Sequence, residues 1–243
     1  MPTAFISGAS RGIGAAIAIK LAQEGYDLAL NYHTNTKAAQ EVAKLTQNYG
    51  AKALLLPGDI ADGKKVKEMF QQANTIFGGI DILINNAGIA EQLMFQDITY
   101  EKWRRMFAVT VDGAYFCLQN ALSYMIKQKH GRIINISSMW GEVGASCEVH
   151  YSAAKGALIA LTKALAKELG PSGITVNCIT PGVITTEMNS HLSEEDLDAL
   201  KEETPLNALG EPNDIAEMVA FLASEKAKFI TGQIIGINGG LVI

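Results

Sequence analysis

The sequence predicts one α/β domain over residues 1–243, in which helices cover both faces of a seven-stranded, doubly wound parallel sheet. The first observation behind this prediction is that short apolar, β-branched runs alternate with longer segments of helical period. The second is that these short runs are mostly apolar and do not alternate between apolar and polar residues, as is usual for strands buried on both faces. The third is that no linker, internal repeat or low-complexity tract divides the chain. Strand–helix units that follow one another in this way are typical of a doubly wound sheet.

The expected elements follow from these patterns. The apolar runs are the predicted strands, at 3–7, 28–32, 53–56, 82–84, 132–137, 175–180 and 234–237. The segments of helical period are the predicted helices, at 13–24, 36–48, 63–77, 100–127, 151–169, 194–203 and 213–224. Local signals support two helix ends, since Ser193 with Asp196 resembles a capping box and Gly170-Pro171 is a common helix stop.

Composition and charge exclude several classes of protein. The chain is 48% hydrophobic and 19% charged, the balance of a compact globular protein, and its net charge is −5. We therefore expect no basic surface that would attract nucleic acid or an anionic membrane. The densest cationic group (Lys127, Lys129, His130 and Arg132) is interpreted as a solvated helix end, with a docking point for an acidic partner as the alternative.

The cysteines and the apolar runs indicate a cytoplasmic protein. Cys117, Cys147 and Cys178 are far apart and form no C-x-x-C pair, so we expect neither a disulfide framework nor a metal site. The N-terminus has no charged segment followed by a long apolar run, so we expect no signal peptide. No stretch approaches the ~18 uninterrupted apolar residues of a membrane span.

A glycine-rich turn follows the first predicted strand. It reads Ser7-Gly8-Ala9-Ser10-Arg11-Gly12-Ile13-Gly14 and opens the first predicted helix. Glycines at these positions let the backbone approach a pyrophosphate, and the helix N-terminus directs free N–H groups at the anion. The turn therefore predicts a nucleotide site in a Rossmann-like domain, with Ser10 and Arg11 among the cofactor contacts.

The end of the second predicted strand favours NADP(H) over NAD. An NAD site usually carries a carboxylate there that bonds the ribose 2′-hydroxyl. Asp27 has nearly the right spacing but precedes the strand, and the far end holds Asn31, Tyr32 and His33 instead. These three residues are candidate cofactor contacts, and Arg11 could pair with a 2′-phosphate.

Two residues on one helical face suggest the reacting groups. Tyr151 and Lys155 are four positions apart, so both project from the same side of the predicted helix. A neighbouring ammonium would bring the phenol, whose ordinary pKa is ~10, toward the working range. Ser138, at the end of a predicted strand, adds a hydroxyl that could polarise a substrate carbonyl.

The order of these motifs resembles the short-chain dehydrogenase/reductase family. The glycine turn, Asn85-Asn86-Ala87-Gly88, Ser138, the Tyr151/Lys155 pair and Pro181-Gly182 follow one another as they do in that family, over essentially the whole chain. Residues 181–188 and 230–240 are most similar to the bacterial 3-oxoacyl-(acyl-carrier-protein) reductases. The resemblance implies the NADPH-dependent reduction of a ketone to a secondary alcohol, most simply a 3-oxoacyl thioester of acyl carrier protein or CoA in fatty acid synthesis.

The resemblance also implies a role for each matching position. Ser138, Tyr151 and Lys155 would be catalytic, and Lys155 would also bond the nicotinamide ribose. The other implied cofactor contacts are Gly8, Gly12, Ile13, Gly14, Asp59, Ile60, Asn86, Ala87, Gly88, Pro181, Gly182, Ile184 and Thr186. Plainer interpretations stay open for some of them: Asn86 could tie strand ends together, Asp59 could cap a helix, and Pro181-Gly182 could be simply a turn.

The chain departs from the family at one catalytic position. Where the family usually has an asparagine that helps hold a water connecting the lysine to solvent, this chain has Thr110. A threonine hydroxyl lacks the reach and the second donor of an amide. We expect the relay to survive with another arrangement of water, the alternative being slower resupply of protons.

Several interpretations remain open for the substrate and the partners. We expect residues 89–97 and 187–205 to close the pocket, with Met94, Phe95, Met139, Trp140 and Met188 as candidates for an apolar entrance. Residues 188–206 also resemble reductases of the 5-aminopentanone modification on elongation factor P, which is an alternative function. A catalytically silent NADP(H)-binding regulator is the other alternative. The resemblance implies a homotetramer, formed through the helices at 100–127 and 151–169.

Overall fold

The computed structural model describes residues 1–189 and 193–243 and confirms the predicted fold class. Seven strands form one sheet in the order β3-β2-β1-β4-β5-β6-β7, and every neighbouring pair is parallel. The chain moves outward from β1 in both directions, so the carboxyl ends of β1 and β4 flank the point where the strand order reverses. The strands are β1 Thr3–Ile6, β2 Asp27–Tyr32, β3 Ala53–Pro57, β4 Ile82–Asn85, β5 Gly131–Ile136, β6 Ile174–Pro181 and β7 Ile234–Ile237.

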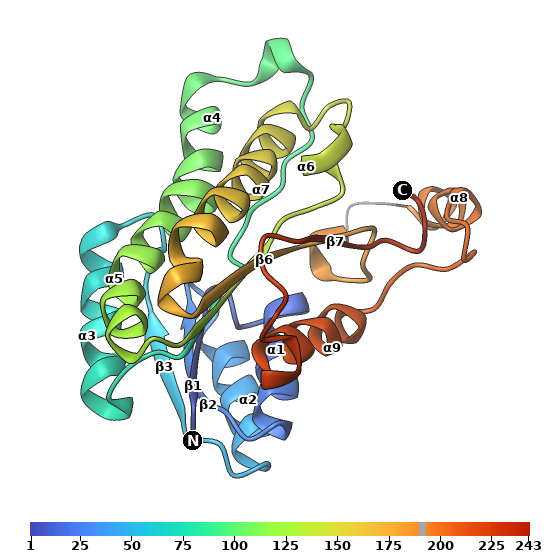
Figure 1. Cartoon of the computed structure of the whole chain (residues 1–243). Coiled ribbons are helices and arrows are strands. Elements are labelled where there is room, and N and C mark those ends of the chain that lie inside the picture. Colours follow the sequence, from blue (N-terminus) through green and yellow to red (C-terminus); the bar gives the residue numbers. More distant parts are fainter. Residues whose placement is uncertain (190–192) are drawn as a thin grey trace.

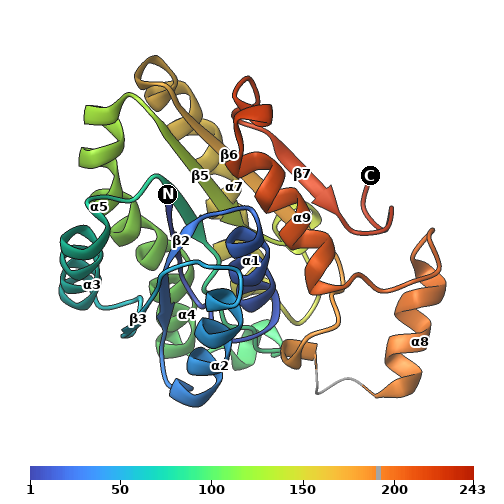
Figure 2. The same cartoon turned by 90° about the horizontal axis from the view of Figure 1, so that it is seen from below.

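Helices cover both faces of this sheet. Figure 1 shows α3, α5 and α7 on one side and α1, α2 and α9 on the other, and Figure 2 shows α8 lying apart from both layers. The α-helices are α1 Gly12–Gln23, α2 Thr36–Gln47, α3 Gly63–Phe77, α4 Tyr100–Phe107, α5 Gly113–Gln128, α6 Trp140–Val143, α7 Val149–Leu169, α8 Glu194–Glu203 and α9 Pro212–Ala223. Ser193 and Asp196 form the expected capping box at the start of α8.

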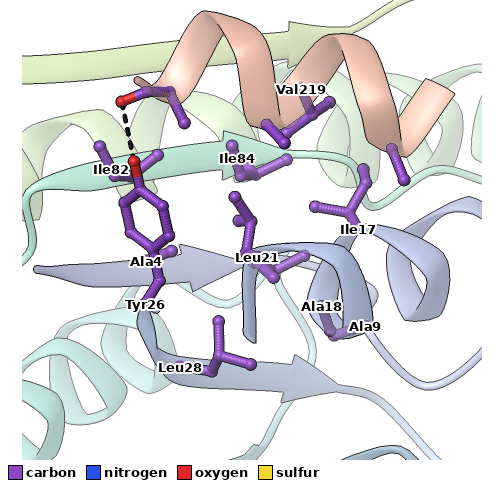
Figure 3. Packing of buried hydrophobic residues seen from close by; sticks show 14 of the residues in the cluster. Ala4, Ala9, Ile17, Ala18, Leu21, Tyr26, Leu28, Ile82, Ile84 and Val219 are labelled. Atoms are coloured by element: carbon purple, nitrogen blue, oxygen red, sulfur yellow. Dashed lines mark hydrogen bonds between the residues drawn. The ribbon is translucent and has the colours of Figure 1, made fainter. Parts of the chain in front are cut away.

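The two helical layers enclose two apolar cores. One core packs α1 and α9 against the face of the sheet that presents Ala4, Leu28 and Ile82, and Figure 3 shows these side chains in one cluster with Leu21 of α1 and Val219 of α9. The second core lies on the opposite face, between the sheet and α3, α5 and α7. Because successive strand residues point to opposite faces, uniformly apolar strands supply both cores at once.

The predicted helix at 100–127 is wrong in one respect, since the structure interrupts it. The segment η2 (Ala108–Asp112) is a π-helical turn between α4 and α5, and Gly113 N–H donates to the carbonyl of Ala108 five residues back. A π-turn accommodates one extra residue in a helix and is frequent at functional sites. The spacing of apolar residues alone cannot reveal this π-turn, because the helical turns before and after it bury the same face.

The cationic group near residue 130 also differs from its expected form. Arg132 is not part of a solvated helix end but the second residue of β5, only 3% exposed, and its Nη2 lies 2.8 Å from Oε1 of Glu225. Lys129 ends α5 in the left-handed conformation, with φ of 53°. The group therefore divides into a buried Arg132, paired with the exposed Glu225, and exposed lysines.

Two further observations concern membranes and metals. Among residues 1–189 and 193–243, no helix has the length and apolar character needed to cross a bilayer. The same residues contain no group of three or more His, Cys, Asp or Glu side chains placed to hold a metal ion.

Candidate active site

A pocket of about 1040 Å³ lies at the carboxyl edge of the sheet, bordered by the segments that follow β1 through β6. Nearly all of the site residues expected from the sequence line it. These are Gly8, Ser10, Arg11, Gly12, Ile13, Gly14, Asn31, His33, Asp59, Ile60, Asn86, Ala87, Gly88, Ser138, Tyr151, Lys155, Pro181, Gly182, Ile184 and Thr186. The fold thus brings the glycine turn and the Ser/Tyr/Lys group, which are far apart in the sequence, to one cavity.

The glycine turn is tightly built, and side chains would not fit in it. Gly8 has φ of +67°, which glycine adopts at little cost. A Cβ on Gly14 would come within 2.2 Å of the carbonyl oxygen of Gly8. Asn86 holds the turn from the side, because its Nδ2 donates to the carbonyls of Ser7 (2.9 Å) and Gly8 (3.1 Å). The packing inside the turn therefore requires glycine at these positions, and Asn86 has the strand-tying role that was its plainer interpretation.

Of the three residues at the end of β2 that were expected to contact the cofactor, only two line the pocket. Asn31 lines the pocket, but its amide is already engaged, accepting from Gly8 N–H (3.3 Å) and donating to the carbonyl of Gly58 (3.0 Å). His33 also lines the pocket. The structure does not bring Tyr32 to it: this side chain is 5% exposed and alternates with Asn31 along the strand. Asp27 is the first residue of β2, at the end remote from the pocket, where it accepts from Lys52 N–H.

Asp59 lies in the pocket wall as a paired carboxylate. Its Oδ1 accepts from Ala61 N–H at 3.0 Å, and its Oδ2 lies 2.7 Å from Nη1 of Arg105. Burial alone would raise the pKa of Asp59, but these two contacts outweigh it and lower the pKa. Asp59 does not cap α3, a role taken by Asp62.

Ser138, Tyr151 and Lys155 are gathered at the floor of the pocket. All three side chains are buried, with exposed fractions of 7%, 9% and 4%. Ser138 and Tyr151 are hydrogen-bonded, and the ammonium of Lys155 lies 5.6 Å from the centre of the Tyr151 ring. Lys155 Nζ also donates to the carbonyl of Ile136 at 2.8 Å. The arrangement offers two hydroxyl donors to a ligand oxygen and one buried cation beside them.

The protonation of this group differs from the sequence-based expectation. Burial raises the pKa of Tyr151 to about 12, although the hydrogen bond with Ser138 acts in the opposite direction. Burial lowers the pKa of Lys155 to about 8. The expected lowering of the phenol pKa by the ammonium is therefore not seen, because desolvation dominates at both residues. At neutral pH the phenol keeps its proton and can act as an acid.

The pH dependence of cofactor binding should follow the loss of the positive charge on Lys155. For the nicotinamide cofactor that the family resemblance implies, with Lys155 bonded to its ribose, we expect kcat/KM to fall as the pH rises through about 8, because Lys155 loses its charge there. Tyr151 keeps its proton over the same range, since its pKa is about 12. Initial rates at limiting cofactor across this range test the prediction. A profile that stays level up to the ordinary lysine pKa of ~10.4 would contradict it.

Two residues that the sequence analysis did not single out hold Lys155 in place. Ser137 Oγ donates to the backbone carbonyl of Lys155 at 2.8 Å, which ties the end of β5 to α7. Gly141 packs against the same point, since a Cβ there would lie 2.9 Å from both Ser137 Oγ and the carbonyl carbon of Lys155. Gly88 approaches from the other side, where a Cβ would lie 3.3 Å from Lys155 Nζ. The only sequence signal for Ser137 and Gly141 is their small size, which has many other causes.

Thr110 is buried near this group but outside the pocket lining. It is 2% exposed and sits in the π-helical turn, and its Oγ1 has no hydrogen-bond partner among the described residues. Its neighbour Val109 lines the pocket. A buried hydroxyl without a protein partner is suited to a water molecule.

The outer wall of the pocket follows the expected segments only in part. Met139, Trp140 and Met188 line it, whereas Met94 (54% exposed) and Phe95 (64% exposed) do not. The lining residues that were not named individually as site residues from the sequence are Thr34, Asn35, Gly58, Ile89, Ala90, Glu91, Gln92, Arg105, Val109, Ile136, Ser137, Glu148, Val183, Glu187, Asn189, Asp196, Ala199, Leu200 and Glu203. Several belong to the predicted closing segments 89–97 and 187–205, of which residues 190–192 lie outside the described part of the chain.

The fold and the pocket define a Rossmann-like α/β protein with a nucleotide-sized cavity at the carboxyl edge of its sheet. A family model described as Enoyl-(Acyl carrier protein) reductase matches residues 8–242. A 3-oxoacyl-[acyl-carrier-protein] reductase of Staphylococcus epidermidis is 40% identical over 239 residues, which cover 98% of each chain. An uncharacterized oxidoreductase of Bacillus subtilis is 42% identical over 239 residues, again 98% of each.

A third relative comes from another bacterium. The 3-oxoacyl-[acyl-carrier-protein] reductase of Aquifex aeolicus is 39% identical over 237 residues, which cover 98% of this chain and 96% of its own. The chain belongs to the short-chain dehydrogenase/reductase family. It is accordingly an oxidoreductase of the ketone–alcohol type, in a family that uses a nicotinamide cofactor.

Proposed function

We propose that this protein reduces a 3-oxoacyl thioester to the 3-hydroxyacyl thioester with NADPH, in fatty acid synthesis. The observation that carries the proposal is the buried Ser138, Tyr151 and Lys155 group at the floor of the same pocket that the glycine turn borders. The reductases of Staphylococcus epidermidis and Aquifex aeolicus, named for 3-oxoacyl-(acyl-carrier-protein) substrates, match the chain almost from end to end.

The residues present fit NADP(H). The glycine turn lines the pocket where α1 begins, at Gly12, which suits a phosphate held by the free N–H groups of a helix N-terminus. The residues beyond β2 that line the pocket, His33, Thr34 and Asn35, include no carboxylate to repel a 2′-phosphate. Arg11 lines the same pocket and can supply the cation. Residues Asp59 and Ile60 would border the adenine, and Ile184 and Thr186 the nicotinamide amide.

The protein side of the mechanism follows from the group at the pocket floor. When bound, the reduced nicotinamide supplies a hydride to the carbonyl carbon. Ser138 and Tyr151 hydrogen-bond the ketone oxygen and stabilise the negative charge that develops on it. Tyr151 then donates its phenolic proton to that oxygen, giving the secondary alcohol, and Lys155 stabilises the phenolate left behind.

Tyr151 must recover a proton after each turnover, and we propose that Thr110 contributes to this step. Its unpartnered, buried hydroxyl in the π-helical turn can hold a water that relays protons toward Lys155. The relay would then work without the amide that the family usually has at this position.

Replacement of Thr110 by the family residue tests this role. We expect Thr110→Asn to change kcat by less than about tenfold, because an existing relay leaves little to gain. General acid–base steps are worth ~10²–10⁴-fold, so a defective native relay would be revealed by a gain of that size. The measurement is kcat at saturating cofactor and ketone. Thr75→Asn is the matched control, because Thr75 is exposed on α3 and its hydroxyl bonds only its own helix, at the carbonyl of Gln71.

The apolar wall of the pocket bears on the identity of the substrate. Met139, Trp140 and Met188 form a wall that suits an acyl chain. The Bacillus subtilis relative, at 42% identity, is named only as an oxidoreductase, so similarity alone does not select a substrate. The 5-aminopentanone group on elongation factor P is therefore retained as the second candidate, and it too is a ketone that the same residues could reduce.

A direct assay separates these substrates. We expect the wild-type protein to oxidise NADPH in the presence of acetoacetyl-CoA, and faster with acetoacetyl-(acyl carrier protein). Turnover of modified elongation factor P in preference to both thioesters would identify its 5-aminopentanone group, and not a thioester, as the substrate. NADPH binding without turnover of any of the three would instead support the catalytically silent regulator.

The assembly state is proposed on the resemblance. A homotetramer would use α4, α5 and α7, and the outer face of α7 exposes the small residues Ala153, Ala160 and Ala164. Light scattering at micromolar concentration tests this, and a monomer would contradict it. The cytoplasmic location stays a prediction from the cysteine pattern.

A further inference from the structure

An ion pair joins the glycine turn to the segment that follows β6. Nη1 of Arg11 lies 2.9 Å from Oε2 of Glu187, although the two residues are 176 positions apart. Both side chains are largely exposed, at 64% and 68%, and both line the pocket. Glu187 is the first residue of the short 3₁₀ helix η4 (Glu187–Asn189).

A second contact brings the same two segments together. A Cβ on Gly12 would lie 3.4 Å from Cγ2 of Thr186, so the segment before η4 rests directly on the glycine turn. The position of Glu187 beside Arg11 is therefore set by packing as well as by charge. Any anion that pairs with Arg11 must lie close to the Glu187 carboxylate.

From these contacts we infer that Glu187 is a residue that sets cofactor selectivity, by competing with the 2′-phosphate of NADPH for Arg11. The inference rests on the proposed function, in which Arg11 supplies the cation for that phosphate. The 2′-phosphate of NADPH either displaces the carboxylate of Glu187 from Nη1 or binds the guanidinium beside it, against its negative charge, whereas NADH, which has no 2′-phosphate, leaves the ion pair intact. Glu187 thereby lowers the preference for NADPH over NADH.

Other carboxylates of the pocket wall have different partners. Asp59 is bonded to Arg105 and Ala61, and Glu91 is bonded to Lys102. Glu148 accepts from the amide of Gln92 at 3.3 Å. Within the described ranges, the ion pair of Arg11 is with Glu187, so neutralising Glu187 should free this guanidinium specifically.

The size of the effect follows from the exposure of the pair. Exposed ion pairs contribute little in water, which corresponds to a change in affinity of about two- to fivefold. Removal of the negative charge also removes its repulsion of the phosphate. We therefore expect Glu187→Gln to lower the Kd for NADPH by about two- to fivefold and to leave the Kd for NADH unchanged.

The experiment is a double-mutant cycle read by cofactor binding. Kd values for NADPH and NADH are measured by fluorescence titration on the wild type, Glu187→Gln, Arg11→Met and the double variant. Glu203→Gln is the matched control, because Glu203 lines the same pocket and the change removes the same unit of charge. We expect Glu187→Gln to tighten NADPH binding only where Arg11 is present, and Glu203→Gln to have a smaller effect.

The outcomes separate this inference from the proposed function. If the wild type prefers NADPH and Arg11→Met abolishes the preference, but Glu187→Gln behaves as Glu203→Gln does, the inference about Glu187 is overturned alone. If the wild type binds NADH as tightly as NADPH and Arg11→Met alters neither, the NADPH assignment fails and the inference fails with it. Tightening of NADH by Glu187→Gln to the same extent would also overturn the inference.

Discussion

Tyr151→Phe is expected to lower kcat by ~10²–10⁴-fold, the range attributed to a positioned general acid. The change removes one oxygen from a side chain that is 9% exposed and leaves the ring that packs with Met106 and Ala154. Folding should therefore be preserved while the proton donor is lost. The measurement is the steady-state rate of NADPH oxidation with acetoacetyl-CoA.

Two controls make the result specific to the phenol. NADPH binding by Tyr151→Phe should remain within a few-fold of the wild type, since the glycine turn and Lys155 are untouched. Tyr115→Phe removes the same atom from an exposed tyrosine (52%) and should be silent. Turnover by Tyr151→Phe close to that of Tyr115→Phe would remove Tyr151 from the mechanism.

Gly14→Ala is the second change for which we expect a large effect, on cofactor binding and on stability. The added Cβ would lie 2.2 Å from the carbonyl oxygen of Gly8 and 2.6 Å from Nδ2 of Asn86, so the backbone of the turn must move. Overpacking of this kind costs ~1–3 kcal/mol. If that cost falls on the cofactor-binding conformation, NADPH affinity drops by about tenfold to a hundredfold.

Gly170→Ala provides the matched control for this substitution. Gly170 has a right-handed backbone, with φ of −50°, and a Cβ there meets no atom within 4 Å apart from its two chain neighbours. Its NADPH affinity should equal that of the wild type, which is the control readout, whereas its melting temperature should fall somewhat because Pro171 disfavours this conformation for a preceding alanine. Tight NADPH binding by Gly14→Ala would show that the turn does not hold the pyrophosphate.

The parts of the fold that the sequence predicts are those encoded in local pattern. Short strands such as β1 and β4 are largely apolar and are buried along their whole length, so their place inside a parallel sheet follows from composition. The glycine turn is recognisable because Gly8 and Gly14 stand where a strand ends and a helix begins. The four-residue spacing of Tyr151 and Lys155 is enough by itself to place both side chains on one helical face.

The features that the sequence analysis missed depend on the face of a strand to which a side chain points, and on contacts between residues far apart in the chain. Tyr32 stands between Asn31 and His33, so the two-residue period of a strand sends it to the face opposite its neighbours. The ion pair of Arg11 with Glu187 joins two segments of the pocket wall and has no local signature. Burial, which depends on all the packed elements together, raises the pKa of Tyr151 although a lysine is nearby.

The most direct test of the proposed reaction is transfer of the label from NADPH in which both hydrogens at nicotinamide C4 are replaced by deuterium. The protein is mixed with this cofactor and acetoacetyl-CoA, and the product is analysed for deuterium at the carbinol carbon. We predict a 3-hydroxyacyl product with one deuterium at that carbon from the wild type, and almost none from Tyr151→Phe in the same time. An unlabelled alcohol, or no alcohol from any 3-oxoacyl thioester while NADPH is bound, would contradict the proposed hydride transfer.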